Sequence, residues 1–209
     1  MGEIKIGRIV MGICQTNVYF IYREGSADCI VVDPADQGDI LAQKLEGKGF
    51  KVKAILLTHG HFDHIWGVES MKEYSEAEVY ASELEKDLLK NPRDNVSKSC
   101  GRPCTVKADH YLKDGDEINL CDIKIKMIST PGHTEGGCCY YIEEAGFLVA
   151  GDTLFRESVG RTDLPTGSMS TLVRSIKEKM LSLPDETKVY PGHGETTTIE
   201  YEKEYNPFL

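Results

Sequence analysis

Four side chains able to bind a metal follow one apolar run, in the segment Thr58-His59-Gly60-His61-Phe62-Asp63-His64. Three further side chains of these types each stand beside a glycine after a β-prone run: His133, Asp152 and His193. Glycine permits sharp turns and close approach of the backbone, so loops of this kind can converge on one point. Imidazole nitrogens suit zinc, iron, nickel or copper, and carboxylates can compensate charge or bridge two ions. The pattern therefore predicts a metal centre.

The spacing of these residues favours two adjacent metal sites. His59 and His61 are two positions apart, so at the end of an extended strand they point the same way, while Asp63 and His64 face elsewhere. A single histidine after a strand is usually a polar loop residue, but four such placements together indicate a site. His110 has no comparable context, and we interpret it as a surface or packing residue. We assign to the first metal His59, His61 and His133, to the second Asp63, His64 and His193, and to the bridge Asp152.

The elements that must position these residues are short strands that lead into loops. Apolar patterning predicts strands over residues 4–10, 18–22, 29–32, 52–57, 78–81, 117–120, 123–128, 138–142, 147–150 and 188–190. It predicts helices over residues 38–47, 65–74, 82–90, 168–183 and 198–205. Ser82 and Glu85 form a candidate capping box at the start of the third helix. Residues 91–108, with two prolines and no clear period, are predicted as a surface loop.

Strands and helices do not alternate strictly in either half of the sequence, so a doubly wound parallel sheet is not expected. Groups of strands with intervening helices instead predict an α/β (α+β) protein in which sheets pack together and helices lie outside. A length of 209 residues suits one domain, which we place over residues 1–209.

Composition narrows the classes of partner. The net charge of −10, from 34 acidic and 24 basic residues, argues against a nucleic acid. No long apolar stretch or export segment stands out, so we expect no membrane partner. An odd number of cysteines, seven, then indicates reduced thiols and a cytoplasmic protein. Cys100 and Cys104 can form a bridge or bind a metal, but without a second pair we favour ordinary loop thiols.

The motifs His-x-His-x-Asp-His, Pro-Gly-His-Thr, Gly-Asp-Thr-Leu-Phe and Pro-Gly-His-Gly resemble those of the metallo-β-lactamase superfamily. The resemblance covers essentially the whole chain, from the strand at Asn17 to the terminal Asn206-Pro207-Phe208-Leu209. It implies a four-layer αββα sandwich with the metals at one edge of the two sheets. Within the superfamily the chain is most similar to the glyoxalase II (hydroxyacylglutathione hydrolase) branch, in its short bacterial form. Gly151 to Phe155 and Gly160-Arg161-Thr162-Asp163 carry this similarity.

Two departures from glyoxalase II concern the thiol carrier. That branch has a C-terminal helical region with basic contacts to glutathione, which this sequence does not include. It also has a tyrosine where this sequence has Asp163, although Arg161 keeps a positive charge. The resemblance therefore implies hydrolysis of a small-molecule thioester of the S-lactoylglutathione type, with the acyl group, the carrier and the oligomeric state left open.

The implied mechanism uses two divalent ions, with zinc preferred and iron or manganese as alternatives. The ions would lower the pKa of a water molecule, and the resulting hydroxide would attack the thioester carbonyl. Asp63 and Asp152 are the predicted catalytic carboxylates, with Asp63 orienting the nucleophile. Asp33 is either an acceptor that fixes a histidine tautomer or part of a strand-ending turn. Arg161 and Phe155 are the predicted substrate contacts, although Arg161 can equally be a solvated loop residue.

The strongest alternative is a persulfide dioxygenase of the same fold, with a single iron held by the equivalents of His59, His133 and Asp152. The Pro-Gly-His-Gly motif at His193 and the Gly-Asp-Thr-Leu-Phe motif favour the hydrolase. Secreted β-lactamases have an export signal and a cysteine at the second metal, where this sequence has Asp152. Nucleases and flavodiiron proteins have additional domains, for which the 209 residues leave no room. A metal that only stabilises the fold is disfavoured, since structural zinc sites are typically rich in cysteine.

Overall fold

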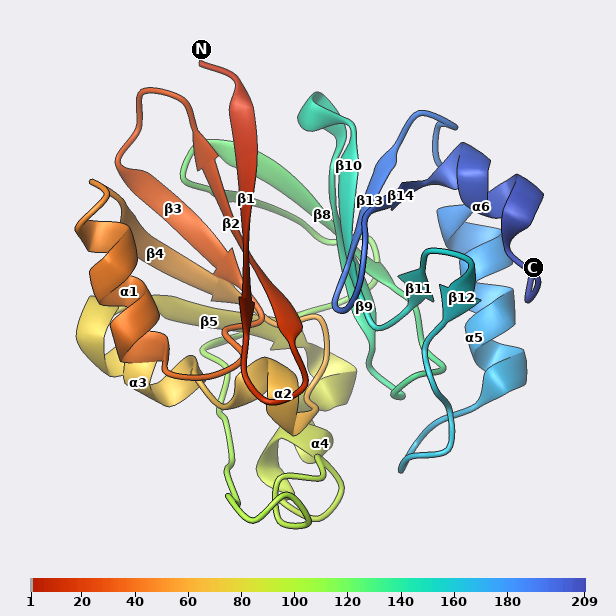
Figure 1. Cartoon of the computed structure of the whole chain (residues 1–209), viewed down its shortest axis with the longest axis horizontal. Coiled ribbons are helices and arrows are strands. Elements are labelled where there is room, and N and C mark those ends of the chain that lie inside the picture. The colour runs from red at the N-terminus through yellow and green to blue at the C-terminus, as the bar shows by residue number, and fades with distance from the viewer. Residues whose placement is uncertain (1) are drawn as a thin grey trace.

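The strands of the computed structural model, which describes residues 2–209, form two six-stranded sheets and one short hairpin (Figure 1). The first sheet has, in spatial order, β1 (Ile4–Met11), β2 (Thr16–Arg23), β3 (Asp28–Val32), β4 (Lys51–Leu56), β5 (Glu78–Ser82) and β6 (His110–Leu112). The second has β14 (Thr197–Thr198), β13 (Lys188–Pro191), β10 (Phe147–Gly151), β9 (Cys138–Ile142), β8 (Ile123–Ser129) and β7 (Glu117–Leu120). The hairpin pairs β11 (Leu154–Phe155) with β12 (Ser158–Val159).

Helices lie on the outer faces of both sheets. On the first sheet, α1 (Gly38–Glu46) and α3 (Val68–Ser75) contact each other and β4. On the second sheet lie α5 (Met169–Ser175), which continues as a π-helical segment, Ile176–Met180, and α6 (Ile199–Tyr205). Figure 1 shows these two pairs on opposite sides of the molecule. Two short helices, α2 (Phe62–Ile65) and α4 (Lys86–Lys90), lie between the elements of the first sheet along the chain.

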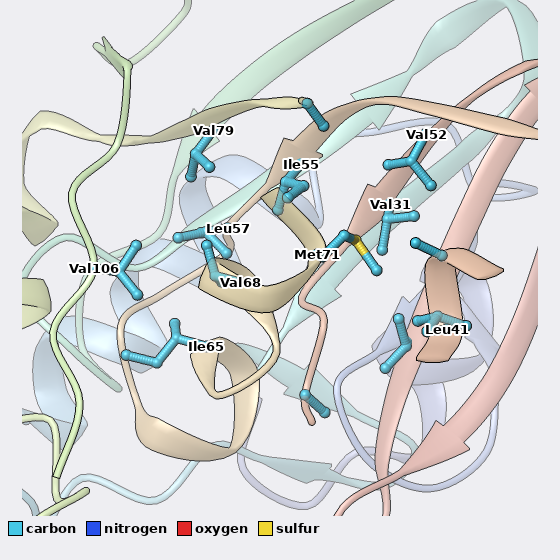
Figure 2. Packing of buried hydrophobic residues seen from close by; sticks show 14 of the residues in the cluster. Val31, Leu41, Val52, Ile55, Leu57, Ile65, Val68, Met71, Val79 and Val106 are labelled. Atoms are coloured by element: carbon cyan, nitrogen blue, oxygen red, sulfur yellow. The ribbon is translucent and has the colours of Figure 1, made fainter. Parts of the chain in front are cut away.

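Three hydrophobic clusters explain the layering. In β3, Cys29 and Val31 face a cluster beneath α1 and α3, part of which Figure 2 shows, and Ile30 and Val32 face the opposite way. Ile30 and Val32 belong to a cluster that both sheets share. The third cluster packs residues of the second sheet against α5, α6 and the π-helical segment. Successive side chains of a strand such as β3 thus point to opposite faces, one toward the helices and one toward the other sheet. The result is the predicted four-layer αββα sandwich, and this fold class is confirmed.

Most predicted elements are present, but the start of the helix predicted over residues 65–74 is wrong, because α3 begins only at Val68. The structure has two helices there, α2 and α3, separated by Trp66 and Gly67. The backbone N–H of Gly67 donates to the carbonyl of Pro34 at 2.8 Å, and a Cβ at Gly67 would lie 2.5 Å from that oxygen. The chain bends because this segment must pass so close to the loop after β3, a contact that no local pattern records.

The capping box at Ser82 is also wrong. A single 3₁₀ turn, Glu83–Glu85, precedes the short α4, and the Ser82 hydroxyl accepts from the backbone N–H of Leu84 at 3.3 Å. Glu85 does not reach back to Ser82; its side chain is turned into the protein and is 1% exposed.

The loop over residues 91–108 has no helix or strand, as predicted, but it is not confined to the surface. Asn95 and Ser97 are fully buried, and the carbonyl of Asn95 accepts from the backbone N–H of Phe62 at 3.0 Å. The strands β6, β11, β12 and β14 were not predicted, since two or three residues are too few to show a period. Over residues 2–209 no helix combines the length and apolarity that crossing a membrane requires.

Candidate metal centre

The seven predicted ligands lie together where strands of both sheets end. Their supporting elements are β4 for His59 and His61, α2 for Asp63 and His64, β8 for His133, β10 for Asp152, and β13 for His193. Two backbone hydrogen bonds join the loops, from Cys138 to the carbonyl of Thr58 at 2.9 Å and from Gly192 to that of Gly151 at 2.8 Å. A Cβ at Gly192 would lie 2.2 Å from Asp152 Oδ1, so this contact requires glycine, as the sequence indicated.

The first predicted group consists of three buried imidazoles. One ring nitrogen from each of His59, His61 and His133 lies within 4.8 Å of the others, and the three residues are 2%, 3% and 4% exposed. His61 Nδ1 and His133 Nε2 face each other at 2.9 Å. Three imidazoles in this arrangement match the donor set of a zinc-type ion.

The second predicted group combines imidazole and carboxylate. Asp63, His64 and His193 also offer ligand atoms within 4.8 Å of one another, and His193 Nε2 lies 3.3 Å from Asp63 Oδ2. Asp152 lies between the two groups: its Oδ1 is 3.4 Å from His64 Nε2, and its Oδ2 is 3.7 Å from His133 Nε2. A carboxylate in that position can bridge two ions.

Asp33 orients histidines of both groups and is not simply part of a turn. Its Oδ2 accepts from His64 Nδ1 at 2.9 Å and from the Thr58 hydroxyl at 2.6 Å, while its Oδ1 accepts from the Thr58 N–H at 2.8 Å. The Thr58 oxygen in turn lies 3.1 Å from His59 Nδ1. Asp33 also lies close enough to His59 and His64 to be a metal ligand itself. However, both of its oxygens already accept hydrogen bonds from Thr58 or His64. Its φ of 51° is a left-handed conformation that aspartate tolerates better than most residues.

A backbone carbonyl orients His133 in the same way. His133 Nδ1 lies 2.7 Å from the carbonyl oxygen of Arg161, and a carbonyl can only accept, so Nδ1 is the donor and Nε2 is the ring atom turned toward the other imidazoles. Buried atoms without a hydrogen-bond partner in the described residues include His59 Nε2, His61 Nε2, His64 Nε2 and Asp152 Oδ1. Unpartnered buried polar groups are costly, and cations bound between them would supply the missing interactions. The histidine and aspartate cluster thus fits the divalent metals of this chemistry.

The electrostatics of the two groups differ. Burial lowers the pKa of His61 to about 3 and that of His59 well below its usual range, so both rings are neutral, as metal ligands must be. Burial also disfavours a charge on His193, but the carboxylates of Asp152 and Asp63 outweigh it and raise its pKa to about 9. Without a metal, protons on the second group balance the carboxylates, and a divalent cation would replace them.

A cleft of about 600 Å³ opens over the two groups. Besides ligands, it is lined by Cys14, Phe62, Val96, Cys100, Phe155, Ser158, Val159, Arg161 and Leu164. Phe155 contacts His193 edge to face, with ring centroids 6.2 Å apart. The Arg161 guanidinium makes two 2.7 Å hydrogen bonds to Asp163 and is more than half exposed. The two predicted substrate contacts therefore both line the cleft.

Several residues of this site were not predicted. Cys14 comes from the turn between β1 and β2, and Val96 and Cys100 come from the loop that was expected only at the surface. All seven cysteines are free, Cys104 among them, so no bridge joins it to Cys100. His110 lies outside the site, where it stacks on Tyr80 with ring centroids 4.4 Å apart. No motif marks Cys14, Val96 or Cys100, since residues of these types are ordinary in loops.

This fold and cluster agree with a family model. The model of the metallo-beta-lactamase superfamily matches residues 11–193, which include all seven predicted ligands, and the chain belongs to that superfamily. The chain is 38% identical over 208 residues to the "Probable metallo-hydrolase YqgX" of Bacillus subtilis (strain 168), covering 99% of this chain and 98% of that protein. It is 32% identical over 201 residues to the "Hydroxyacylglutathione hydrolase GloC" of Haemophilus influenzae, covering 93% of each. The family thus supports a metal-dependent hydrolase.

Solved structures agree with this membership. A structure named BLEG-1 B3 metallo-beta-lactamase has a TM-score of 0.93 and 38% identity, covering 98% of this chain and 99% of that one. TTHA1623 in a di-iron-bound form has a TM-score of 0.85 and 33% identity, covering 97% and 100%. ETHE1 from Myxococcus xanthus has a TM-score of 0.78 and 28% identity, covering 97% and 83%. The resemblance to the superfamily is confirmed, while the glyoxalase II branch stays a prediction.

Proposed function

We propose that this chain is a binuclear metal-dependent hydrolase that cleaves small-molecule thioesters of the hydroxyacyl-thiol type. The observation that carries the proposal is the position of Asp152, whose two oxygens face His64 at 3.4 Å and His133 at 3.7 Å. A single ion would need only one of the two groups that Asp152 connects. The GloC relative is named for hydrolysis of a compound of this class, which supports the choice of substrate.

The residues of the chain prepare the site for attack on a carbonyl. When bound, two divalent ions supply Lewis acidity, which lowers the pKa of water and polarises a carbonyl oxygen. Asp63 Oδ2 accepts from the Thr16 hydroxyl at 3.3 Å and lies 3.3 Å from His193 Nε2, so its carboxylate is held in one orientation. In that orientation it can accept a hydrogen bond from the attacking water and direct its lone pair toward the substrate. Asp33 and the Arg161 carbonyl keep the imidazoles aligned.

The lining of the cleft favours a thioester over an amide. Apart from the seven ligands, the residues described there include no carboxyl or imidazole group that could protonate a departing amine. A thiolate leaves without protonation, because the pKa of a thiol is only about 8.5. Phe155, Val96 and Leu164 offer apolar surface to the substrate, and Arg161 offers its charge to an anionic part.

The metals are proposed to be zinc, with iron or manganese as alternatives, since the donors are nitrogen and oxygen throughout. The di-iron form of TTHA1623 is the observation that keeps iron open. We also expect the protein in a reducing compartment, the cytoplasm, because all seven cysteines are free.

The test combines metal counting with a panel of substrates. Protein purified without added metal is first analysed for its metal content per chain. It is then assayed for hydrolysis of S-lactoylglutathione and of a chromogenic cephalosporin, and for oxygen consumption with glutathione persulfide. We expect two ions per chain and hydrolysis of the thioester. The hydrolysis should be lost in His61→Ala and kept in His110→Ala. The His110→Ala control removes a histidine outside the site.

Other outcomes would assign another reaction. About one iron per chain with oxygen uptake would replace the hydrolase by the persulfide dioxygenase. Rapid opening of the cephalosporin without thioester hydrolysis would place the activity with the function that BLEG-1 is named for.

A further inference from the structure

Glu85 is a buried carboxylate that the proposed chemistry does not use. It is 1% exposed and lies in the 3₁₀ turn that follows β5, not in any loop that carries a ligand. Its Oε2 accepts from the backbone N–H of Gly60 at 3.1 Å, and its Oε1 accepts from the hydroxyl of Thr134. The backbone N–H of Gly136 is a further donor to the same carboxylate.

The partners of Glu85 are the immediate neighbours of the first predicted metal group. Gly60 stands between His59 and His61, and Thr134 directly follows His133. One oxygen of Glu85 therefore holds the loop after β4, and the other holds the loop after β8. These two loops supply all three imidazoles of that group, whereas Asp63 and His64 of the second group lie in α2.

The packing around this contact leaves little freedom. A Cβ at Gly60 would lie 3.0 Å from Glu85 Oε2, and a Cβ at Gly136 would lie 2.5 Å from the backbone nitrogen of Glu85. Both loops are thus pressed against the 3₁₀ turn through glycines. A carboxyl group has two oxygens that accept hydrogen bonds, so it suits a position that donors approach from two sides. A buried carboxylate is costly unless it has such partners, and here every partner belongs to a loop of the first group.

We propose that Glu85 is a positioning residue that fixes the distance between the loop of His59 and His61 and the loop of His133, so that their three imidazoles are set to bind one cation. This inference rests on the proposed metal centre but not on the reaction it performs. Groups that orient metal ligands from outside typically contribute a factor of about 10 to 100 in metal affinity.

Three variants and a matched control test the proposal. Glu85→Ala removes both acceptors, Glu85→Gln keeps an acceptor for Gly60 and a partner for Thr134, and Thr134→Val removes one hydroxyl. The control is Glu202→Ala, because Glu202 is also fully buried and accepts from a threonine hydroxyl and a backbone N–H, those of Thr197 and Glu157.

The measurement is stepwise titration of the metal-free proteins with Zn²⁺ against a competing chelator, together with thermal unfolding. For Glu85→Ala we expect one of two binding steps to weaken by about 10- to 100-fold while the other stays near wild type. Thr134→Val is expected to weaken the same step to a smaller extent, and Glu85→Gln to restore it largely. Glu202→Ala is expected to lower the unfolding temperature without changing either step.

Three other results would contradict the proposal that Glu85 positions the two loops. If Glu85→Ala loses thermal stability but binds both ions as the wild type does, Glu85 only stabilises the fold. If both steps weaken equally in Glu85→Ala and in the Glu202→Ala control, the effect comes from general loss of stability. If Glu85→Ala does not fold, an unchanged step in Thr134→Val overturns the proposal by itself. Wild-type protein that binds two ions but cleaves no thioester would refute the proposed function and leave this inference intact.

Discussion

The substitution Asp33→Asn tests whether orientation of the histidines from outside matters. Asp33 is 2% exposed and accepts three hydrogen bonds, from the N–H and the hydroxyl of Thr58 and from Nδ1 of His64. Asparagine has nearly the same volume and tolerates the left-handed φ of 51° at this position. The change therefore replaces one acceptor oxygen by a donor and alters little else.

Either orientation of the new amide leaves a buried donor facing another donor. If the NH₂ group takes the place of Oδ2, it faces His64 Nδ1, and the imidazole loses the acceptor that holds its proton there. If it takes the place of Oδ1, it faces the backbone N–H of Thr58. An unsatisfied buried donor costs about 1–3 kcal/mol. In the first orientation, His64 is held less well, and we expect the affinity for metal to fall by roughly 10- to 100-fold. In the second orientation, the backbone of Thr58 loses its acceptor, and we expect the free energy of unfolding to fall instead.

The assay measures both quantities on the same protein. Zn²⁺ affinity is determined by chelator competition, and the free energy of unfolding of the metal-free protein by urea titration. We expect Asp33→Asn to lose about 1–3 kcal/mol in at least one of them. The surface change Asp185→Asn serves as a control, since the side chain of Asp185 pairs with that of exposed Lys203 at 2.6 Å, far from the histidines. Wild-type values in both measurements would refute the argument that Asp33 orients ligands.

Three further predictions concern the ligands, pH and the cleft. His61→Ala and Asp152→Ala should each abolish turnover and lower the metal content, measured by elemental analysis; wild-type activity in either would show that the assignment is wrong. The pKa of His193 is raised to about 9 in the folded protein, compared with about 6.5 in the unfolded chain. Its contribution to the stability of the metal-free protein is therefore complete below about pH 6.5 and is lost as the pH rises through 9. Thermal unfolding measured across this pH range checks the prediction, and a rise in stability with pH would contradict it. Asp163→Asn should free the Arg161 guanidinium and lower KM several-fold for an anionic thioester but not for a neutral one; equal changes for both would exclude Arg161 as the anion contact.

The cluster of candidate ligands could be predicted from the sequence because its signal is local. His59 to His64 are close in the chain, and each remaining ligand follows a recognisable strand and a glycine. Residues that end neighbouring strands are brought together by the sheets themselves, so the sequence did not need to record the contacts between loops. Sheets packed between helices could be predicted from the grouping of strands and helices along the chain, and the four-layer form from the resemblance to the superfamily.

Apart from Asp33, which was a candidate acceptor at the end of its strand, the residues that support the candidate ligands could not be predicted, because their partners are distant in the chain. Glu85 fits a capping box by spacing alone, yet its hydrogen bonds lead to Gly60 and Thr134. Cys100 lies in a stretch without periodicity, yet it lines the cleft opposite residues of the second sheet. In both cases the tertiary contact overrides a local preference, which is the general weakness of reasoning from short windows.

One loop links the choice of substrate to the metal centre. The carbonyl of Arg161 holds His133 Nδ1 at 2.7 Å, while the side chain of the same residue lines the cleft. The two roles use different atoms, so a substitution of Arg161 can change what the cleft binds and leave the orientation of the imidazole unchanged. A change that moves the backbone, such as proline at this position, would disturb both. Substitutions of Arg161 and Asp163 at constant metal content therefore test which substrate the cleft binds without disturbing the imidazole.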